Sequence, residues 1–218
     1  RTVAQNVGYG LAIQGRAAAE IERQTAYWLE RVGLGGQGAR YPGQLSGGMQ
    51  QRVGLARALA TDAEILLMDE AFSALDPLIR RDMQDMLLAL QAELRKTIVF
   101  ITHDLDEAIR IGDDIAILRD GEIVQQGSAE QIVLAPADDY IADFVRDIDP
   151  GRVIRLGSIM RPLEDGQGGP ELERGLLLEE AARRFAGMDG DTARVIDESG
   201  RVVGMVTVRD VLAAMVRG

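Results

Sequence analysis

The sequence contains no cysteine and few aromatic residues, and it is strongly acidic. The absence of cysteine excludes disulfides and thiolate metal sites, which fits a reducing compartment. Aromatic residues make up 4% of the chain and the net charge is −11, so stacking on nucleobases and attraction to phosphate backbones are both disfavoured. No apolar run is long enough to span a bilayer. We therefore expect neither a disulfide scaffold, a broad nucleic-acid binder nor a transmembrane helix.

Lysine and histidine each occur only once, as Lys96 and His103. The chain begins Arg1-Thr2-Val3 without an initiator methionine, so we expect it to be part of a longer protein. Its 218 residues, 46% of them hydrophobic, suffice for one large domain or two small ones with a buried core.

Two short apolar runs, residues 65–68 and 97–102, flank a segment with helical signals. Asp76 and Pro77 are typical of a helix N-cap and first turn, and apolar residues recur at helical spacing after them. Because both runs are almost wholly apolar, the pattern predicts a strand–helix–strand unit with parallel strands covered on both faces.

Polar residues with chemical potential follow both predicted strands. Asp69 and Glu70 come directly after the first, and His103 follows the second. In open α/β sheets, ligands bind outside the carboxyl ends of the strands, so we expect these three side chains to gather at one edge. A lone histidine or an acidic pair is more typical of a solvated loop, but their convergence favours a site.

A glycine-broken turn, Leu45-Ser46-Gly47-Gly48, precedes a predicted helix that continues to about residue 60. Free amide groups at a helix N-terminus attract anions, and glycines allow a phosphate to approach closely. Taken alone, these residues are more typical of a flexible loop with a serine cap.

The longer string at residues 45–59 resembles the signature motif of ABC-type ATPases. Residues 65–70 are similar to the Walker B strand of that family, residues 73–76 to its D-loop, and His103 to its switch histidine. The order and spacing of these motifs carry the resemblance, which covers roughly residues 1–147. It implies ATP and Mg²⁺ as cofactors.

The resemblance also implies a role for each motif residue. Asp69 would hold Mg²⁺ through water, Glu70 would orient or deprotonate the attacking water, and His103 would contact the γ-phosphate. A further set of residues would bind the ATP that a second subunit holds: Ser46, Gly47, Gly48 and Gln50. The D-loop would consist of Ser73, Ala74, Leu75 and Asp76.

The family also needs a Walker A loop, Gly-x-x-x-x-Gly-Lys-Ser/Thr, to cradle phosphates. The only lysine, Lys96, follows Arg95 and not glycine, and we expect it to stabilise the end of the preceding helix. We therefore expect the Walker A and Q-loop portion to be absent from this chain, and the chain alone to be inactive.

Residues 68–80 and 99–108 resemble a narrower group, the ATP-binding subunits of glycine betaine/proline importers. Residues 160–162, 193–197 and 204–210 are similar to one CBS domain. Within it, Thr207 and Asp210 are candidate ligand contacts, although Thr-x-x-Asp before an apolar run is equally a helix capping box, and we favour the capping box.

The expected fold class is α/β: a partial ABC-type P-loop NTPase domain with a parallel sheet and a helical subdomain, residues 1–147, followed by a linker and a small α+β CBS-like domain, residues 148–218. The resemblance implies a homodimer of ATPase subunits, docked through residues 16–45 to a membrane permease at the cytoplasmic face. A substrate-binding protein would take part indirectly. It implies no nucleic-acid partner.

Two alternatives remain open. One is a soluble ABC ATPase with another role, such as DNA repair or translation. The other is a non-catalytic regulatory or interaction module, which the missing Walker A loop favours.

Several local patterns predict further elements. We expect helices over residues 16–32 and 106–111, around Leu178 and Phe185, and from Arg209. Glycine-rich loops are expected at 33–43 and 165–170, and a domain boundary at 149–151. We also expect a hairpin around Asp120-Gly121, a capping box at Ser128 and Gln131, and two strands flanking 198–200.

Overall fold

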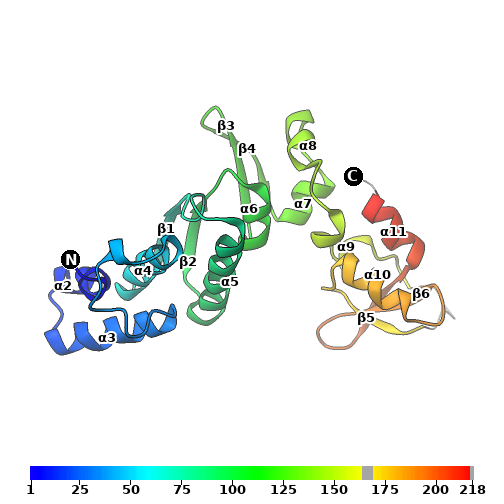
Figure 1. Cartoon of the computed structure of the whole chain (residues 1–218). Coiled ribbons are helices and arrows are strands. Elements are labelled where there is room, and N and C mark those ends of the chain that lie inside the picture. The colour runs from blue at the N-terminus through cyan, green and yellow to red at the C-terminus, as the bar shows by residue number, and fades with distance from the viewer. Residues whose placement is uncertain (164–168, 217–218) are drawn as a thin grey trace. The chain divides into compact units, whose positions relative to one another are not determined.

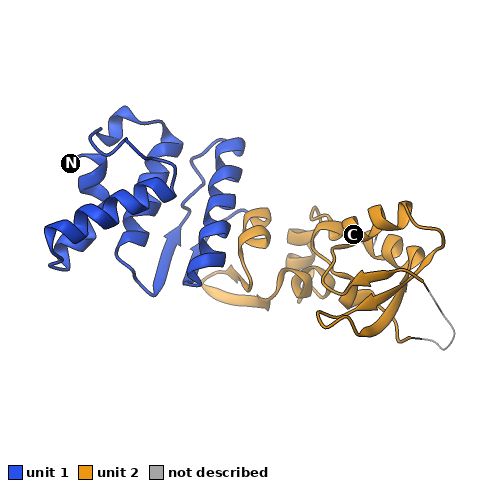
Figure 2. Ribbon diagram, turned by 90° about the horizontal axis from the view of Figure 1, so that it is seen from below, with its two compact units in different colours: residues 1–104 blue, residues 105–218 orange. Residues whose placement is uncertain are grey.

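The computed structural model describes residues 1–163 and 169–216. The chain divides into two compact units, residues 1–104 and residues 105–218, coloured separately in Figure 2. Most of the predicted glycine-rich loop at 165–170 lies outside the described residues. None of the described helices is long and apolar enough to cross a membrane.

The first unit contains a group of helices followed by a strand–helix–strand segment (Figure 1). Its elements are α1 (Val3–Val7), α2 (Tyr9–Ile13), α3 (Ala18–Arg31), the 3-10 helix η1 (Pro42–Gln44), α4 (Gly47–Ala60), β1 (Ile65–Asp69), α5 (Pro77–Leu94) and β2 (Thr97–Ile101).

The helix starts in this unit follow from local capping. Asp76 accepts hydrogen bonds from the amides of Leu78 and Ile79, as predicted for the N-cap of α5. The sequence analysis predicted no helix before residue 16, yet Thr2 and Gln5 form a capping box that starts α1. The five-residue length of α1 and α2 gives too little periodicity to recognise.

The strands β1 and β2 pair in parallel, with Ile65 opposite Thr97 and Asp69 opposite Ile101, as predicted. The expectation that both faces are covered is wrong for the described residues. Leu66 is 6% exposed, whereas Leu67 is 79% exposed. Because successive side chains point to opposite faces, one face of the pair is buried and the other presents apolar side chains, namely Ile65, Leu67, Val99 and Ile101.

The second unit contains a hairpin with short helices and then a three-stranded sheet with its own helices (Figure 1). Its elements are α6 (Leu105–Ile111), β3 (Ile115–Arg119), β4 (Glu122–Gly127), α7 (Ala129–Leu134), α8 (Asp139–Val145), the 3-10 helix η2 (Pro150–Arg152), α9 (Leu156–Ile159), β5 (Glu171–Glu173), α10 (Leu178–Ala186), β6 (Thr192–Ile196), β7 (Val202–Thr207) and α11 (Val208–Val216).

The predicted hairpin and capping box are confirmed. Asp120 and Gly121 have φ angles of 54° and 84°, and a turn with two positive φ values matches the twist of antiparallel strands. Ser128 and Gln131 cap α7 reciprocally. The apolar sides of the hairpin and of α7 and α8 share one core cluster, which includes Ile132.

The sheet of the C-terminal part has the order β5-β6-β7, with β5 parallel and β7 antiparallel to β6. The predicted strands around 198–200 and the helix around Leu178 and Phe185 are present, and both residues lie in the core cluster of this part. The sequence analysis missed β5, since three residues carry no recognisable alternation.

The predicted boundary at 149–151 is a packed turn, because Pro150 and Gly151 are buried and the Gly151 amide donates to Asp149. The two compact units meet at residues 104 and 105. The division into domains at 147 and 148 stays a prediction.

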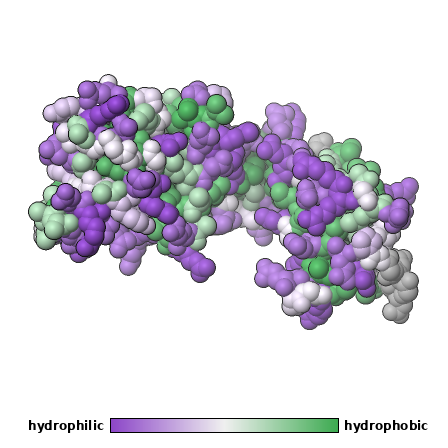
Figure 3. All heavy atoms as spheres, turned by 60° about the horizontal axis from the view of Figure 1, so that its bottom comes forward, coloured by the Kyte–Doolittle hydropathy of each residue, from purple (hydrophilic) through white to green (hydrophobic). Residues whose placement is uncertain are grey.

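On the face drawn in Figure 3, hydrophilic side chains surround smaller patches of hydrophobic surface.

Candidate active site

The candidate site lies where β1 and β2 end. Asp69, the last residue of β1, is paired with Ile101, the last residue of β2. The amide of Glu70 donates to the Ile101 carbonyl oxygen at 2.8 Å, which extends the strand pairing by one hydrogen bond. His103 follows two residues after Ile101, so the topology alone brings Glu70 and His103 to the same edge.

The structure brings Glu70 and His103 into direct contact. Glu70 Oε1 lies 3.0 Å from His103 Nδ1, and both side chains are solvent-accessible. Glu70 has a φ of 44°, a left-handed conformation that is uncommon for residues other than glycine and that recurs at functional sites. A carboxylate beside an imidazole can orient a water molecule and exchange a proton with it.

Asp69 offers an exposed carboxylate next to this pair. Within residues 1–163 and 169–216 no three His, Asp or Glu side chains are grouped as a metal site would require. Mg²⁺, however, commonly takes one or two protein carboxylates and fills its other positions with water and substrate phosphates. The single carboxylate group of Asp69 therefore fits Mg²⁺ bound together with a phosphate ligand.

The signature turn lies on a different element. Ser46 caps α4, and its Oγ accepts from the Met49 amide at 3.4 Å. Gln50 does not point away from the turn, because its Nε2 donates to the Leu45 carbonyl oxygen at 3.1 Å. Among the described residues no hydrogen bond joins Ser46 to Glu70 or His103, so the structure does not bring the two predicted parts of the site together.

The two glycines of the turn differ in what they accommodate. A Cβ at Gly47 would meet no atom within 4 Å, which leaves the start of the helix open to a ligand. A Cβ at Gly48 would lie 2.6 Å from Ile79 Cγ2, so glycine is required there for α4 to pack against α5. The sequence analysis assigned both glycines to phosphate approach and missed the packing reason at Gly48.

The predicted D-loop turns the chain from β1 into α5. The Ser73 hydroxyl donates to the Glu70 carbonyl oxygen at 3.0 Å. Leu75 is buried and Ala74 is exposed, while Asp76 caps α5. This turn is therefore bonded to the backbone of Glu70.

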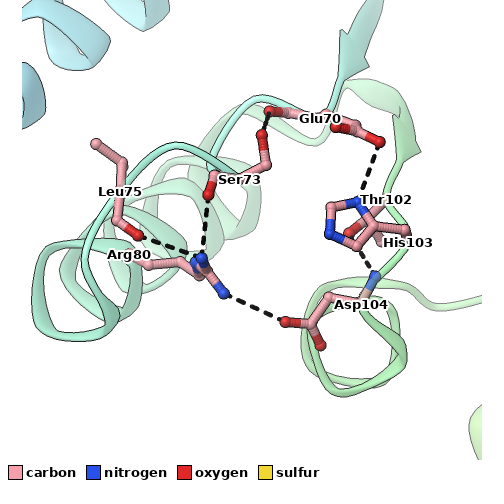
Figure 4. A network of polar contacts seen from close by, with 7 residues as sticks. All are labelled: Glu70, Ser73, Leu75, Arg80, Thr102, His103 and Asp104. Atoms are coloured by element: carbon pink, nitrogen blue, oxygen red, sulfur yellow. Dashed lines mark hydrogen bonds and ion pairs between the residues drawn. The ribbon is translucent and has the colours of Figure 1, made fainter.

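The sequence analysis gave no role to Arg80, which contacts both sides of the site (Figure 4). Its guanidinium donates to the carbonyl oxygens of Ser73 and Leu75, each at 3.2 Å, and to Asp104 Oδ2 at 3.3 Å. A cation near a helix N-terminus is unfavourable, but Arg81 shares this position, so the sequence carries no signal that separates Arg80 from its neighbour.

The role predicted for Lys96 is wrong. Its Nζ donates to Asp62 Oδ1 at 2.7 Å and to the Ala63 carbonyl oxygen at 2.8 Å. It therefore binds the segment that leads into β1, because the chain reverses at Arg95, which has a φ of 51°, and directs the next side chain away from the helix end.

Thr207 and Asp210 form the predicted capping box of α11. The Asp210 amide donates to Thr207 Oγ1 at 3.2 Å, and the Thr207 amide and hydroxyl donate to Asp210 Oδ2 at 3.1 and 2.8 Å. Burial opposes ionisation of Asp210, but these hydrogen bonds and the Arg161 guanidinium hold its pKa below the ordinary value. Local hydrogen bonding thus accounts for both residues.

A groove of about 850 Å³ lies in the first unit, between α1, α2, α3 and the glycine-rich segment that follows α3. Its lining is mostly apolar, with Glu22 and Glu30 as acidic members. Thr25, only 6% exposed, also lines it, and its hydroxyl has no hydrogen-bond partner among the described residues. An unpaired buried hydroxyl of this kind is uncommon in folded proteins.

Comparison with known proteins extends the resemblance along the chain. The glycine betaine/carnitine transport ATP-binding protein GbuA of Listeria monocytogenes is 50% identical over 214 residues, which cover 97% of this chain and 52% of that protein. The glycine betaine transport ATP-binding protein OpuAA of Bacillus subtilis is 56% identical over 164 residues, 75% of this chain and 39% of that protein.

A third relative has the same character. The glycine betaine/proline betaine transport system ATP-binding protein ProV of Salmonella typhimurium is 46% identical over 220 aligned residues, 98% of this chain and 53% of that protein. The chain thus spans about half the length, or less, of these relatives.

Two family models match separate parts of the chain. Residues 1–73 match the ABC transporter family and residues 172–217 match the CBS domain. Two separate segments of the chain thus match the ABC transporter family and the CBS domain, and along nearly its whole length the chain is similar to the ATP-binding proteins of glycine betaine transport systems.

Proposed function

We propose that this chain is part of the ATP-hydrolysing subunit of a membrane importer for glycine betaine, proline or related quaternary ammonium osmolytes. The observation that carries the proposal is the 3.0 Å contact between Glu70 and His103 at the carboxyl ends of two parallel strands, with Asp69 beside it. No residue of the site indicates which solute is transported. The proposed class of solute is therefore supported only by the names of the relatives.

Each residue at the strand ends has a separate task. Glu70 orients and deprotonates the water that attacks the terminal phosphate, and His103 contacts that phosphate. Asp69 would hold Mg²⁺ through water, and the bound ion would supply charge neutralisation at the phosphate oxygens. Phosphoryl transfer depends mostly on positioning and charge stabilisation, so small displacements of Glu70 or His103 lower the rate.

The signature turn completes the nucleotide site of a second copy of the subunit. Ser46 and Gln50 fix the shape of the turn, and the open space beside Gly47 lets a phosphate reach the helix amides. This arrangement requires a homodimer that holds ATP between its subunits. It is consistent with the absence, among the described residues, of a hydrogen bond between Ser46 and the Glu70–His103 pair.

The groove beside α3 is the docking site for the permease. Its mostly apolar lining suits the apolar face of a short helical segment. The subunit is accordingly peripheral at the cytoplasmic face of the plasma membrane, and a substrate-binding protein delivers the solute to the permease without touching this chain.

Uptake measurements test this proposal. The protein that contains this chain, expressed with its permease and binding protein in bacteria without osmolyte importers, should restore uptake of radiolabelled glycine betaine at high osmolarity. The Glu70→Gln variant, expressed at the same level, should not. Uptake of an unrelated solute in place of glycine betaine, proline and their methylated analogues would contradict the assigned substrate class.

A further inference from the structure

The segments that follow β1 and β2 are joined at two places (Figure 4). One is the 3.0 Å contact between Glu70 Oε1 and His103 Nδ1. The other is the ion pair between Arg80 Nη1 and Asp104 Oδ2, at 3.3 Å. Because Asp104 follows His103 in the chain, the ion pair with Arg80 restrains the backbone beside His103.

Arg80 also holds the segment that leaves Glu70. Its Nη2 donates to the carbonyl oxygens of Ser73 and Leu75. The hydroxyl and the amide of Ser73 donate in turn to the Glu70 carbonyl oxygen, at 3.0 and 3.2 Å. The contacts therefore close a ring that runs from Glu70 through Arg80 to His103 and back to Glu70.

The stability of α5 does not explain the position of Arg80. It is the fourth residue of the helix, where a positive charge opposes the helix dipole. Its Nε is buried and has no hydrogen-bond partner among the described residues, which also costs free energy. The adjacent Arg81 is exposed and provides a matched comparison.

We propose that Arg80 is a positioning residue for the Glu70–His103 pair. By binding Asp104 and two carbonyl groups of the 73–75 turn, it fixes the distance between the segments that carry the two side chains. The inference rests on the proposed function, since it concerns the reaction of that pair. A misplacement of about 1 Å in a catalytic group lowers a rate by about a hundredfold.

The only histidine of the chain gives a direct readout. In the 218-residue chain, Glu70→Gln should shift the imidazole nitrogen resonances of His103, because it replaces the contacting carboxylate. In an Arg80→Ala background the same change should produce less than half of that shift, whereas in Arg81→Ala the full shift should remain. An equal shift in the Arg80→Ala background, or no shift in the parent chain, would overturn the proposal.

A second variant guards against loss of folding. Asp104→Asn breaks the same ion pair from the other side and should reduce the Glu70-dependent shift in the same direction. If Arg80→Ala is not folded at the temperature of the measurement, the result for Asp104→Asn is used in its place. A chemical-shift change in that variant as large as in the parent chain would overturn the inference.

Kinetics of the assembled transporter provide the functional arm. Arg80→Ala should lower kcat for ATP about tenfold and leave KM within about twofold, because the reacting groups and not nucleotide binding are disturbed. Arg81→Ala should change neither, and equal kcat values in the two variants would overturn the proposal. If the parent protein hydrolyses no ATP, the proposed function fails, while the His103 resonances still decide whether Arg80 positions the pair.

Discussion

At the scale of single residues, the neighbouring glycines Gly47 and Gly48 have different packing environments. Gly48 allows α4 to approach Ile79 on α5, while Gly47 faces open space. Gly48→Ala should therefore lower the free energy of unfolding by about 1–3 kcal/mol through overpacking. Gly47→Ala, its control, should leave stability unchanged or slightly raised, since alanine favours the helix. Urea denaturation of both variants measures the difference, and equal losses would contradict the packing reason.

Asp210 gives a second prediction at this scale. Its pKa is depressed in the folded chain, so its contribution to stability is full above about pH 3.8 and is lost as the pH falls through the folded pKa. Asp210→Asn should lower the unfolding free energy at pH 7 by about 1 kcal/mol, because asparagine can still accept from Thr207 but lacks the charge that strengthens these hydrogen bonds and pairs with Arg161. The gap between the two proteins should narrow as the pH falls below about 3.8; a gap independent of pH would show that the carboxylate charge has no role.

At the scale of elements, the β1–β2 pair has one buried and one exposed apolar face. In the 218-residue chain, Leu66→Ala should cost about 2–5 kcal/mol because it leaves a cavity in the core. Leu67→Ala, on the exposed face, should change stability by no more than about 0.5 kcal/mol. Similar losses at the two positions would mean that both faces are covered in solution.

The elements also show how far the sequence could lead. Apolar runs, the Asp76 cap and the Asp120-Gly121 turn were sufficient to predict β1, α5, β2 and the β3–β4 hairpin, since these depend on local signals. Whether a strand is covered on one face or two depends on which other elements reach it, and apolar composition alone does not report that. Short elements such as α1 and β5 carry too few residues for a periodic signal.

Prediction of the candidate site was uneven for the same reason. The proximity of Glu70 and His103 could be predicted from the sequence, because each residue lies just after one of two neighbouring parallel strands. The role of Arg80 could not be read in this way, since it depends on a side chain spanning a turn and a second segment. Lys96 was misassigned because the reversal at Arg95 was not foreseen.

At the scale of the whole molecule, the chain corresponds to about half of GbuA and of ProV, and to 39% of OpuAA. Its 218 residues contain no Gly-x-x-x-x-Gly-Lys-Ser/Thr sequence. In the proposed reaction, the strand-end residues would act together with a phosphate-binding loop contributed by other residues. In the second unit, residues 172–217 match the CBS domain, and within this segment Thr207 and Asp210 form the capping box of α11.

The most direct test of the account is ATP turnover by the assembled transporter that carries this chain, with the parent protein compared with Glu70→Gln. We predict that the substitution lowers kcat by at least about a hundredfold, the usual contribution of a general base, while ATP still binds. The 218-residue chain alone should show no turnover. Hydrolysis at the parental rate in Glu70→Gln would contradict the claim that the ends of β1 and β2 form the hydrolytic site.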